Sequence, residues 1–304
     1  MPRTVSIGCQ DFETIRRENC FYVDKTLFIQ EWWEQMDSVT LITRPRRFGK
    51  TLLMSMVEKF FSMDSTAGEN LFQGLKIWEI EEYRKLQGSY PVISLSFASI
   101  KEQNYHLAHR KICQILSGLY SQYRFLLNGD ILDNKEKKFF ESVSADMEDV
   151  EATLAIQQLS LYLSRYYGKK VIILLDEYDT PMQEAYVNGY WDEMTLFIRS
   201  LFNAAFKTNL YLERALLTGI TRVSKESIFS DLNHLRVIVT TSEAYEDSFG
   251  FTEQEVFEAL DEFGLSEQRA DVKSWYDGFT FGKRMDIYNP WSIINYLKTK
   301  KLEA

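Results

Sequence analysis

Apolar residues are spaced in two different ways on either side of a short basic stretch. Residues Val39–Thr43 form an apolar, β-branched run, and Thr51–Phe61 ("TLLMSMVEKFF") then carries apolar residues at helical spacing. The order along the chain is therefore a predicted strand, a turn and a helix.

The rest of the first 220 residues alternates between predicted strands and helices. The run "VIILL" (171–175) has no polar alternation, which is typical of a strand buried on both faces in a parallel sheet. Further strands are predicted at 90–97, where Pro91 can open but not interrupt a strand, and at 210–219. Helices are predicted at about 104–124, 148–167 and 192–206, with a polar break at 127–134. This alternation predicts right-handed βαβ crossovers and a mostly parallel α/β sheet flanked by helices.

The pattern changes after about residue 245. Thr252 and Glu255 form a capping-box pair at the start of an amphipathic helix that Gly264 ends, and a last helix begins at Pro290. We interpret 1–244 as the main domain and 245–304 as a small helical lid or appendage that continues it.

Composition sets limits on the kind of protein this is. Hydrophobic residues make up 45% of the 304 residues and aromatic residues 14%, enough for a large core. A formal charge of -9 argues against an overall cationic surface for nucleic acid. Three cysteines without paired spacing indicate a reducing compartment, and no stretch approaches the ~18 apolar residues of a membrane span. We therefore expect a cytoplasmic protein.

The basic stretch between the first strand and helix ends like a phosphate-binding loop. Gly49, Lys50 and Thr51 supply a tight turn, an ammonium group for the β- and γ-phosphates, and a hydroxyl ligand for Mg²⁺. Gly-Lys-Thr alone is a weak signal, but the preceding strand and following helix are the context that supports it. The second Gly-Lys pair, in "FGKR" at 281–284, lacks both a buried strand before it and a hydroxyl after it.

One position departs from the usual loop, because Arg44 stands where the first glycine normally permits a tight turn. Pro45 can fix the turn instead, and Arg46 and Arg47 add positive charge beside the phosphates. The alternative is a solvated basic turn. We expect the nucleotide to be bound by Arg44, Pro45, Arg46, Arg47, Phe48, Gly49, Lys50, Thr51 and Leu52.

Acidic residues begin where the aliphatic run 171–175 stops. Asp176 is a candidate Mg²⁺ ligand together with Thr51, and Glu177 is a candidate general base for the attacking water. The alternative is a pair of carboxylates that end a strand in solvent. Asp179 and Thr180 either add polar groups or form a turn closed by Pro181.

The strand predicted at 210–219 ends in a further polar pair. Thr218 stands where a residue could sense the γ-phosphate, and Arg222 could stabilise charge during phosphoryl transfer. The candidate catalytic set is accordingly Glu177, Lys50, Thr218 and Arg222.

A separate cluster has the spacing of one helix face. His106, His109 and Cys113 could approach a metal ion from one side, but no further ligand set with matching spacing accompanies them. Ordinary surface histidines are the favoured interpretation.

Several long motifs occur in a fixed order: "DFETIRRENCFYVDKT", "LITRPRRFGKTLLMSMVEKFF", "VIILLDEYDTP", "LLTGITRVSKESIFSDLNHL" and "WYDGFTFG" followed by "YNPWSIINYL". Through them the chain resembles the AAA-ATPase-like family of bacterial P-loop proteins. The resemblance implies a P-loop NTPase fold, in which an arginine at position 44 is normal, and it marks Asp24 and Lys25 without giving them a role. Such proteins usually continue into a PD-(D/E)XK nuclease-like domain. None of its pattern follows the last helix, so we expect no nuclease activity from this chain.

Three functions remain open from the sequence. The favoured one is Mg²⁺-dependent binding and hydrolysis of ATP that regulates an attached nuclease-like domain or a partner protein, with oligomers possible and nucleic acid involved at most indirectly. The second is a non-hydrolysing, nucleotide-dependent interaction module, against which Glu177 argues because mere binding needs no general base. A phosphotransferase is the weakest, since no acceptor-binding motif stands out.

Overall fold

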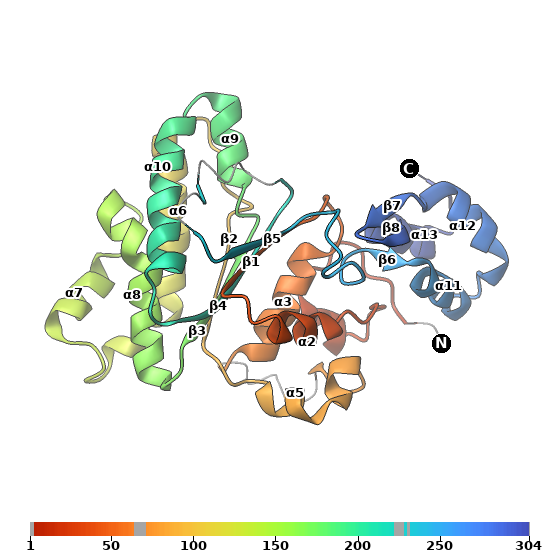
Figure 1. Cartoon of the computed structure of the whole chain (residues 1–304), viewed down its shortest axis with the longest axis horizontal. Helices are drawn as coiled ribbons and strands as arrows, with labels where there is room; N and C mark the ends of the chain where they lie inside the picture. The colour runs from red at the N-terminus through yellow and green to blue at the C-terminus, as the bar shows by residue number, and fades with distance from the viewer. Residues whose placement is uncertain (1–2, 64–70, 222–227, 230–231, 304) are drawn as a thin grey trace. The chain divides into compact units, whose positions relative to one another are not determined.

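The computed structural model describes residues 3–63, 71–221, 228–229 and 232–303. The chain forms two compact units, each assembled from separate stretches. The first comprises Met1–Met36, Thr43–Ser89 and Ile238–Ala304, and the second comprises Asp37–Ile42 and Tyr90–Val237. Figure 1 follows the chain through its helices and strands.

A five-stranded parallel sheet forms the centre of the second unit. Its strands lie in the order β2-β3-β4-β1-β5. Strands β2 and β4 pair with β3 on either side, with Leu95 opposite Leu175 and Leu175 opposite Leu217. The strands are β1 (Val39–Thr43), β2 (Val92–Ser96), β3 (Val171–Asp176), β4 (Leu212–Gly219) and β5 (Leu235–Ile238). Every residue of β1 and β3 is buried, as their unbroken apolar runs predict.

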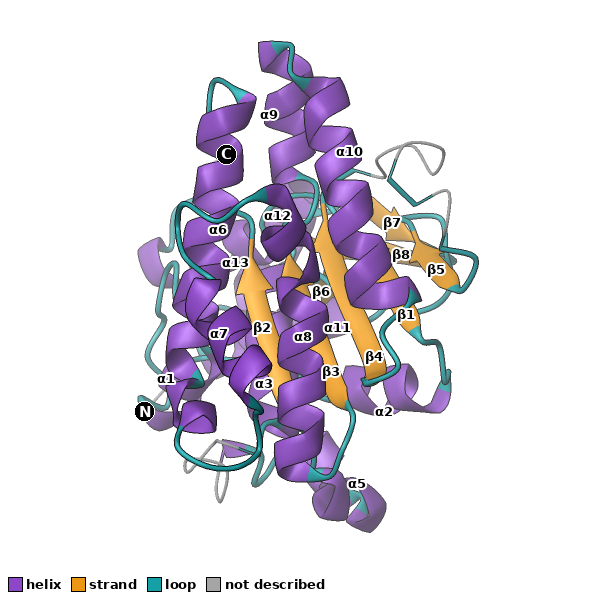
Figure 2. Ribbon diagram, turned by 90° about the vertical axis from the view of Figure 1, so that its left-hand side faces the viewer, coloured by secondary structure: helices purple, strands orange, loops and turns teal. Residues whose placement is uncertain are grey.

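Long helices of the second unit cover one face of this sheet. Helices α6, α8 and α10 stand side by side there (Figure 2). The Tyr120 hydroxyl of α6 donates to the Ala155 carbonyl of α8 at 2.7 Å, inside a core of buried aliphatic and aromatic side chains. The helices of this unit are α6 (Tyr105–Gln122), η2 (Arg124–Leu127), α7 (Asn134–Ser142), α8 (Asp149–Tyr167), α9 (Thr180–Asn188), α10 (Trp191–Phe202) and the π-helical turn η3 (Asn203–Lys207).

The first unit contains helices from both ends of the chain and a small antiparallel sheet. That sheet has the order β6-β8-β7, with β6 (Phe251–Thr252), β7 (Phe279–Phe281) and β8 (Arg284–Tyr288). The helices are α1 (Phe12–Arg17), α2 (Leu27–Glu34), α3 (Lys50–Phe61), η1 (Lys76–Glu79), α5 (Glu81–Leu86), α11 (Glu253–Glu262), η4 (Ser266–Gln268), α12 (Arg269–Tyr276) and α13 (Pro290–Thr299). The expected capping box of α11 is present, with Thr252 and Glu255 each bonded to the other's backbone.

The predicted fold class is confirmed, and the predicted strands and long helices are present with ends that differ by at most four residues. Helices α1, α5, α7, α9 and α12 were not predicted, because each has only six to nine residues and spans too few turns to show a clear apolar period. The segment after residue 245 was expected to be helical, and it also holds the sheet β6-β8-β7. A domain boundary between 244 and 245 stays a prediction.

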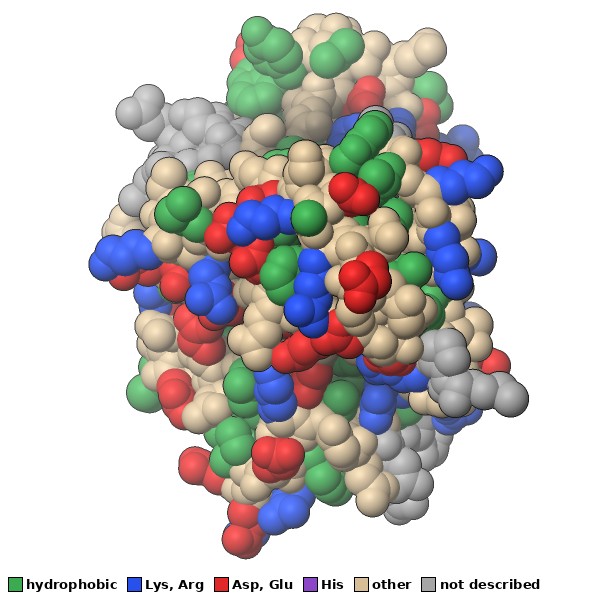
Figure 3. Space-filling model, turned by 90° about the vertical axis from the view of Figure 1, so that its right-hand side faces the viewer, with side chains coloured by type: hydrophobic (Ala, Val, Ile, Leu, Met, Phe, Trp, Pro, Cys, Tyr) green, Lys and Arg blue, Asp and Glu red, His purple; other side chains and the backbone are tan. Residues whose placement is uncertain are grey.

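Among the described residues, no helix is long and apolar enough to cross a membrane. On the face drawn in Figure 3, Lys and Arg side chains lie among Asp and Glu side chains and do not gather into one basic area.

Candidate phosphate loop and acidic strand end

Residues 44–49 connect β1 to α3 and form the candidate phosphate loop. Helix α3 begins at Lys50, and its N-cap Gly49 has φ +84°. Arg47 also has a positive φ, +68°, whereas Arg44 does not. The turn thus needs left-handed backbone at Arg47 and Gly49 but not at Arg44, the first position of the loop. The positive dipole end of the 12-residue helix α3 then follows the turn directly.

Lys50 folds back over this loop. Its ammonium group donates to the carbonyl oxygens of Arg44 and Pro45, both at 2.9 Å, and the residue is only 6% exposed. The lysine is therefore held beside the loop backbone, at the helix terminus where an anion would be bound.

Arg44 is not part of a solvated basic turn. The residue is fully buried, and its guanidinium lies 4.7 Å from the ring centre of Phe281 and 5.3 Å from that of Phe249. Its Nη1 donates to the Thr43 carbonyl at 3.0 Å. Arg46 and Arg47 are exposed, and Arg47 lies 4.8 Å from the ring centre of Trp291. The three arginines thus have separate environments.

Phe48 attaches the middle of the loop to the segment that follows β5. Its buried ring makes edge contacts with Phe279 and Phe281, with centroids 4.8 and 5.3 Å away. The N–H of Gly250 donates to the Phe48 carbonyl at 3.4 Å. Gly250 has φ +77°, and a Cβ there would lie 2.5 Å from Cγ2 of Ile287, so only glycine fits.

A cavity of about 90 Å³ adjoins this loop within the first unit. Gly49 lines it together with Leu52 and Met56 of α3, and Tyr22 and Ile294 come from opposite ends of the chain. Its lining is mainly apolar, which suits a flat, uncharged group better than a phosphate.

Strand β3 ends at the candidate metal ligand. Asp176 is buried, and the hydroxyl of the buried Thr218, near the end of the neighbouring strand β4, donates to its Oδ1. The structure therefore brings together two of the residues that the sequence singled out. The carboxylate has a fixed orientation and is not a solvated strand end.

Glu177 adopts a strained backbone directly after Asp176. Its φ is +50°, which is uncommon for a residue other than glycine, asparagine or aspartate. The side chain is partly exposed, and its Oε2 accepts a hydrogen bond from the Thr180 hydroxyl at 3.1 Å. Strain of this kind persists where the surrounding structure holds a residue in place, often at functional sites.

The Asp179 carboxylate makes more hydrogen bonds than its sequence context suggested. Its Oδ2 accepts hydrogen bonds from the backbone N–H groups of Ile220 and Thr221, at 3.0 and 2.8 Å, and from the Thr221 hydroxyl and Gln183 amide. This fully buried carboxylate ties the turn after β3 to the turn after β4. The only sequence signal was an aspartate next to a helix start. Arg222, the predicted charge stabiliser, lies outside the described residues.

Asp24 and Lys25 have structural contacts within the first unit. Asp24 accepts hydrogen bonds from the backbone N–H groups of Thr26 and Lys76, at 2.9 and 2.7 Å. Lys25 forms an ion pair with Glu255 of the α11 capping box at 2.7 Å, although burial lowers its pKa. The contacts of Asp24 with Lys76 and of Lys25 with Glu255 join sequence-distant segments, which explains why sequence alone gave the two residues no role.

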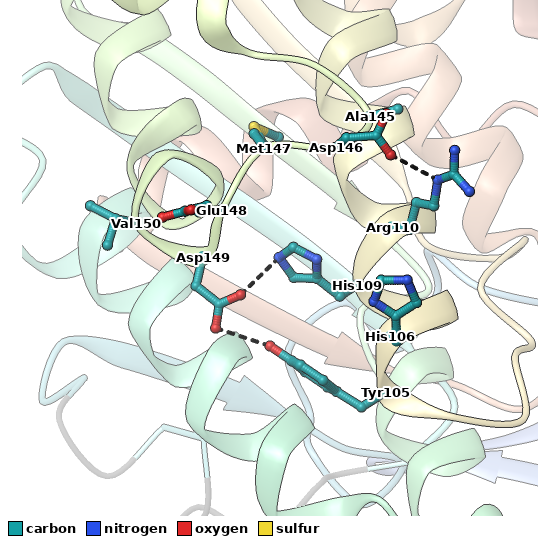
Figure 4. Close-up of a pocket in the computed structure, with 10 residues that line it drawn as sticks. All are labelled: Tyr105, His106, His109, Arg110, Ala145, Asp146, Met147, Glu148, Asp149 and Val150. Atoms are coloured by element: carbon teal, nitrogen blue, oxygen red, sulfur yellow. Dashed lines mark hydrogen bonds and ion pairs between the residues drawn. The ribbon is translucent and has the colours of Figure 1, made fainter.

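The histidine cluster on α6 forms part of a separate pocket of about 470 Å³ (Figure 4). Asp149 accepts from the Tyr105 hydroxyl at 3.1 Å and lies 3.0 Å from His109 Nε2. Cys113 packs against the His109 ring, and burial raises the pKa of its thiol to about 12. Within the described part of the chain no three His, Cys, Asp or Glu side chains are grouped so that they could hold a metal ion.

The sequence of this chain matches that of a known protein family. The sequence profile of the family described as "Predicted AAA-ATPase" matches residues 6–229. The chain belongs to this family. The AAA-ATPase match covers the loop, the acidic strand end and Thr218, and it supports a nucleotide-binding, ATPase-like module. The resemblance inferred from the sequence motifs is thereby confirmed.

A protein of Azotobacter chroococcum mcd 1, described as "Uncharacterized protein in vnfD 5'region", is 26% identical to this AAA-ATPase family member over 294 residues. The alignment covers 96% of this chain and 51% of the relative, so the chain spans about half the length of the curated relative that it matches.

Proposed function

We propose that this chain binds ATP and hydrolyses it in a Mg²⁺-dependent reaction that regulates an attached or partner domain. The observation that carries the proposal is the loop 44–49, which ends in left-handed Gly49 and places Lys50 at the first position of α3. A loop of this form presents N–H groups, a helix dipole and an ammonium group to the same anion.

Each part of the loop has an assigned role in this proposal. The backbone of residues 44–52 surrounds the phosphates, and Lys50 exchanges the carbonyl oxygens of Arg44 and Pro45 for the β- and γ-phosphate oxygens. The adjoining apolar cavity beside Leu52 and Met56 receives the base.

Thr51 and Asp176 are the proposed Mg²⁺ ligands, because a hydroxyl and a carboxylate are the hard oxygen donors that this ion prefers. A bound Mg²⁺ ion would neutralise charge on the phosphate oxygens. Thr218 orients Asp176 through its hydroxyl. Glu177 accepts a proton from the attacking water, for which its partly exposed carboxylate is available.

Chain topology supports the use of these groups on one nucleotide. Asp176 ends β3 and Thr218 lies near the end of β4, while the loop starts directly after Thr43, the last residue of β1. The three strands run parallel, with β4 between β3 and β1, so their carboxyl ends lie at the same edge of the sheet.

Phosphate release and ATP binding should be measured on the purified chain and on Lys50→Ala and Glu177→Gln. We expect Lys50→Ala to lose ATP binding, and Glu177→Gln to bind ATP and turn it over at least tenfold more slowly. Lys283→Ala is the matched control, since Lys283 also follows a glycine but lies exposed in a β-hairpin. Equal phosphate release by all four proteins would refute hydrolysis.

A non-hydrolysing interaction module is the second candidate. The binding result separates it from the first: ATP binding without turnover in the wild type would favour a nucleotide-dependent regulator. A wild type that binds no ATP would refute the nucleotide role of the loop.

A further inference from the structure

Arg44 is a buried cation that no described carboxylate contacts. Within the part of the chain that the structure describes, its Nη1 donates to the Thr43 carbonyl at 3.0 Å, while its buried Nε and Nη2 have no hydrogen-bond partner. Among the described residues, no carboxylate forms an ion pair with this guanidinium. The residue is 0% exposed, so bulk water does not reach the guanidinium.

Such an arrangement is unfavourable in the ligand-free protein. The π faces of Phe249 and Phe281 attract the guanidinium and compensate for part of its lost hydration free energy. They accept no N–H hydrogen bond of ordinary strength, and an unpaired buried charge is among the most destabilising groups in a protein interior. Burial lowers the pKa of Arg44 to about 10, which still leaves it charged at neutral pH. An apolar side chain of similar length would fill the same space at lower cost.

The position of Arg44 in the loop suggests what the charge is for. Arg44 is the first residue of the candidate phosphate loop, and its own carbonyl oxygen holds the ammonium group of Lys50. A polyphosphate bound at Lys50 would bring several negative charges to the loop that Arg44 opens. In a poorly hydrated interior, a charge acts over longer distances than at an exposed site.

We propose that the buried charge of Arg44 is part of the polyphosphate-binding site, and that it favours nucleotides with more phosphate groups while destabilising the empty protein. The inference rests on the proposed function and deepens it, because it assigns to Arg44 a selectivity for nucleoside triphosphates over diphosphates and monophosphates. The competing view is that Arg44 only anchors the loop to Phe249 and Phe281.

Arg44→Met tests the proposal, because methionine retains an unbranched side chain and removes the charge. Urea unfolding without nucleotide, and the affinities for ATP, ADP and AMP, should be measured on Arg44→Met, Arg44→Lys and the wild type. We expect Arg44→Met to be at least as stable as the wild type when empty, and to bind ATP about tenfold more weakly. The loss of affinity in Arg44→Met should be largest for ATP, smaller for ADP and smallest for AMP. Arg44→Lys should keep most of the affinity of the wild type.

Lys283→Met is the control for removal of a positive charge, because Lys283 is exposed and paired with Glu243. We expect it to change neither stability nor affinity. If Arg44→Met does not fold, Arg44→Gln takes its place in the affinity series.

Two results would overturn the inference while leaving the proposed function intact. One is an Arg44→Met protein that is less stable when empty and binds ATP as tightly as the wild type, which is the behaviour of an anchor. The other is an Arg44→Met protein that loses affinity for ATP and for AMP by the same factor. Absence of ATP binding by the wild type would instead refute the proposed function itself.

Discussion

The left-handed backbone at position 177 should strain the protein more with a glutamate there than with a glycine. With φ at +50°, its Cβ lies close to the following carbonyl oxygen, a contact that glycine avoids. We therefore predict that Glu177→Gly is more stable than Glu177→Ala. Both substitutions remove the bond between Glu177 and Thr180, so that loss cancels in the comparison.

The size of the difference follows from two opposing contributions. A left-handed conformation costs a residue with a Cβ about 1–2 kcal/mol. Glycine loses about 0.4–1 kcal/mol more chain entropy than alanine on folding. From the midpoints of these two ranges, the free energy of unfolding of Glu177→Gly should exceed that of Glu177→Ala by about 0.8 kcal/mol.

Equilibrium urea unfolding of the nucleotide-free protein measures this difference. Glu213 provides a matched control, because it is a partly buried glutamate of β4 without positive φ. There we expect the opposite order, with glycine less stable than alanine by about 0.5–1 kcal/mol. A Glu177→Gly protein that is no more stable than Glu177→Ala would show that the backbone strain argued here is absent. Both Glu177 variants should lose ATP turnover.

Three further predictions concern other contacts. Thr218→Val removes the hydroxyl that donates to Asp176, and should lower ATP turnover about 10–100-fold without loss of ATP binding, as measured by phosphate release and by titration. Lys25→Met leaves Glu255 without its cation and should lower the free energy of unfolding by about 2 kcal/mol; an unchanged urea midpoint would contradict this. Gly250→Ala forces a Cβ against Ile287 at a positive φ, and should cost about 2 kcal/mol in the same assay.

The fold class could be predicted because its strongest signals are local. An unbroken aliphatic run such as 171–175 is needed only where a strand is buried on both faces, and the helix after the loop has a clear apolar period. The pairing of Thr218 with Asp176 was within reach for the same reason, since neighbouring parallel strands end at one edge of a sheet.

Contacts between distant segments could not be predicted. Lys25 meets Glu255 across 230 positions, and Asp179 binds the backbone of Ile220 and Thr221 across more than 40. No local propensity or period encodes such a contact, because it depends on how the elements pack. The burial of Arg44 could not be predicted for the same reason, since Phe249 and Phe281 lie 205 and 237 residues further along the chain.

The arginine at the head of the loop and the aromatic residues of the C-terminal segment are explained by the same geometry. The turn takes its left-handed backbone at Arg47 and Gly49, so nothing requires glycine at position 44 and a long side chain can occupy it. That side chain extends to Phe249 and Phe281, and Phe48 adds a second contact to Phe281. A glycine-rich loop is held by its backbone alone, whereas this loop is also attached through side chains. A change in loop geometry on binding phosphate would therefore alter the packing of β7 and its neighbours, within one compact unit.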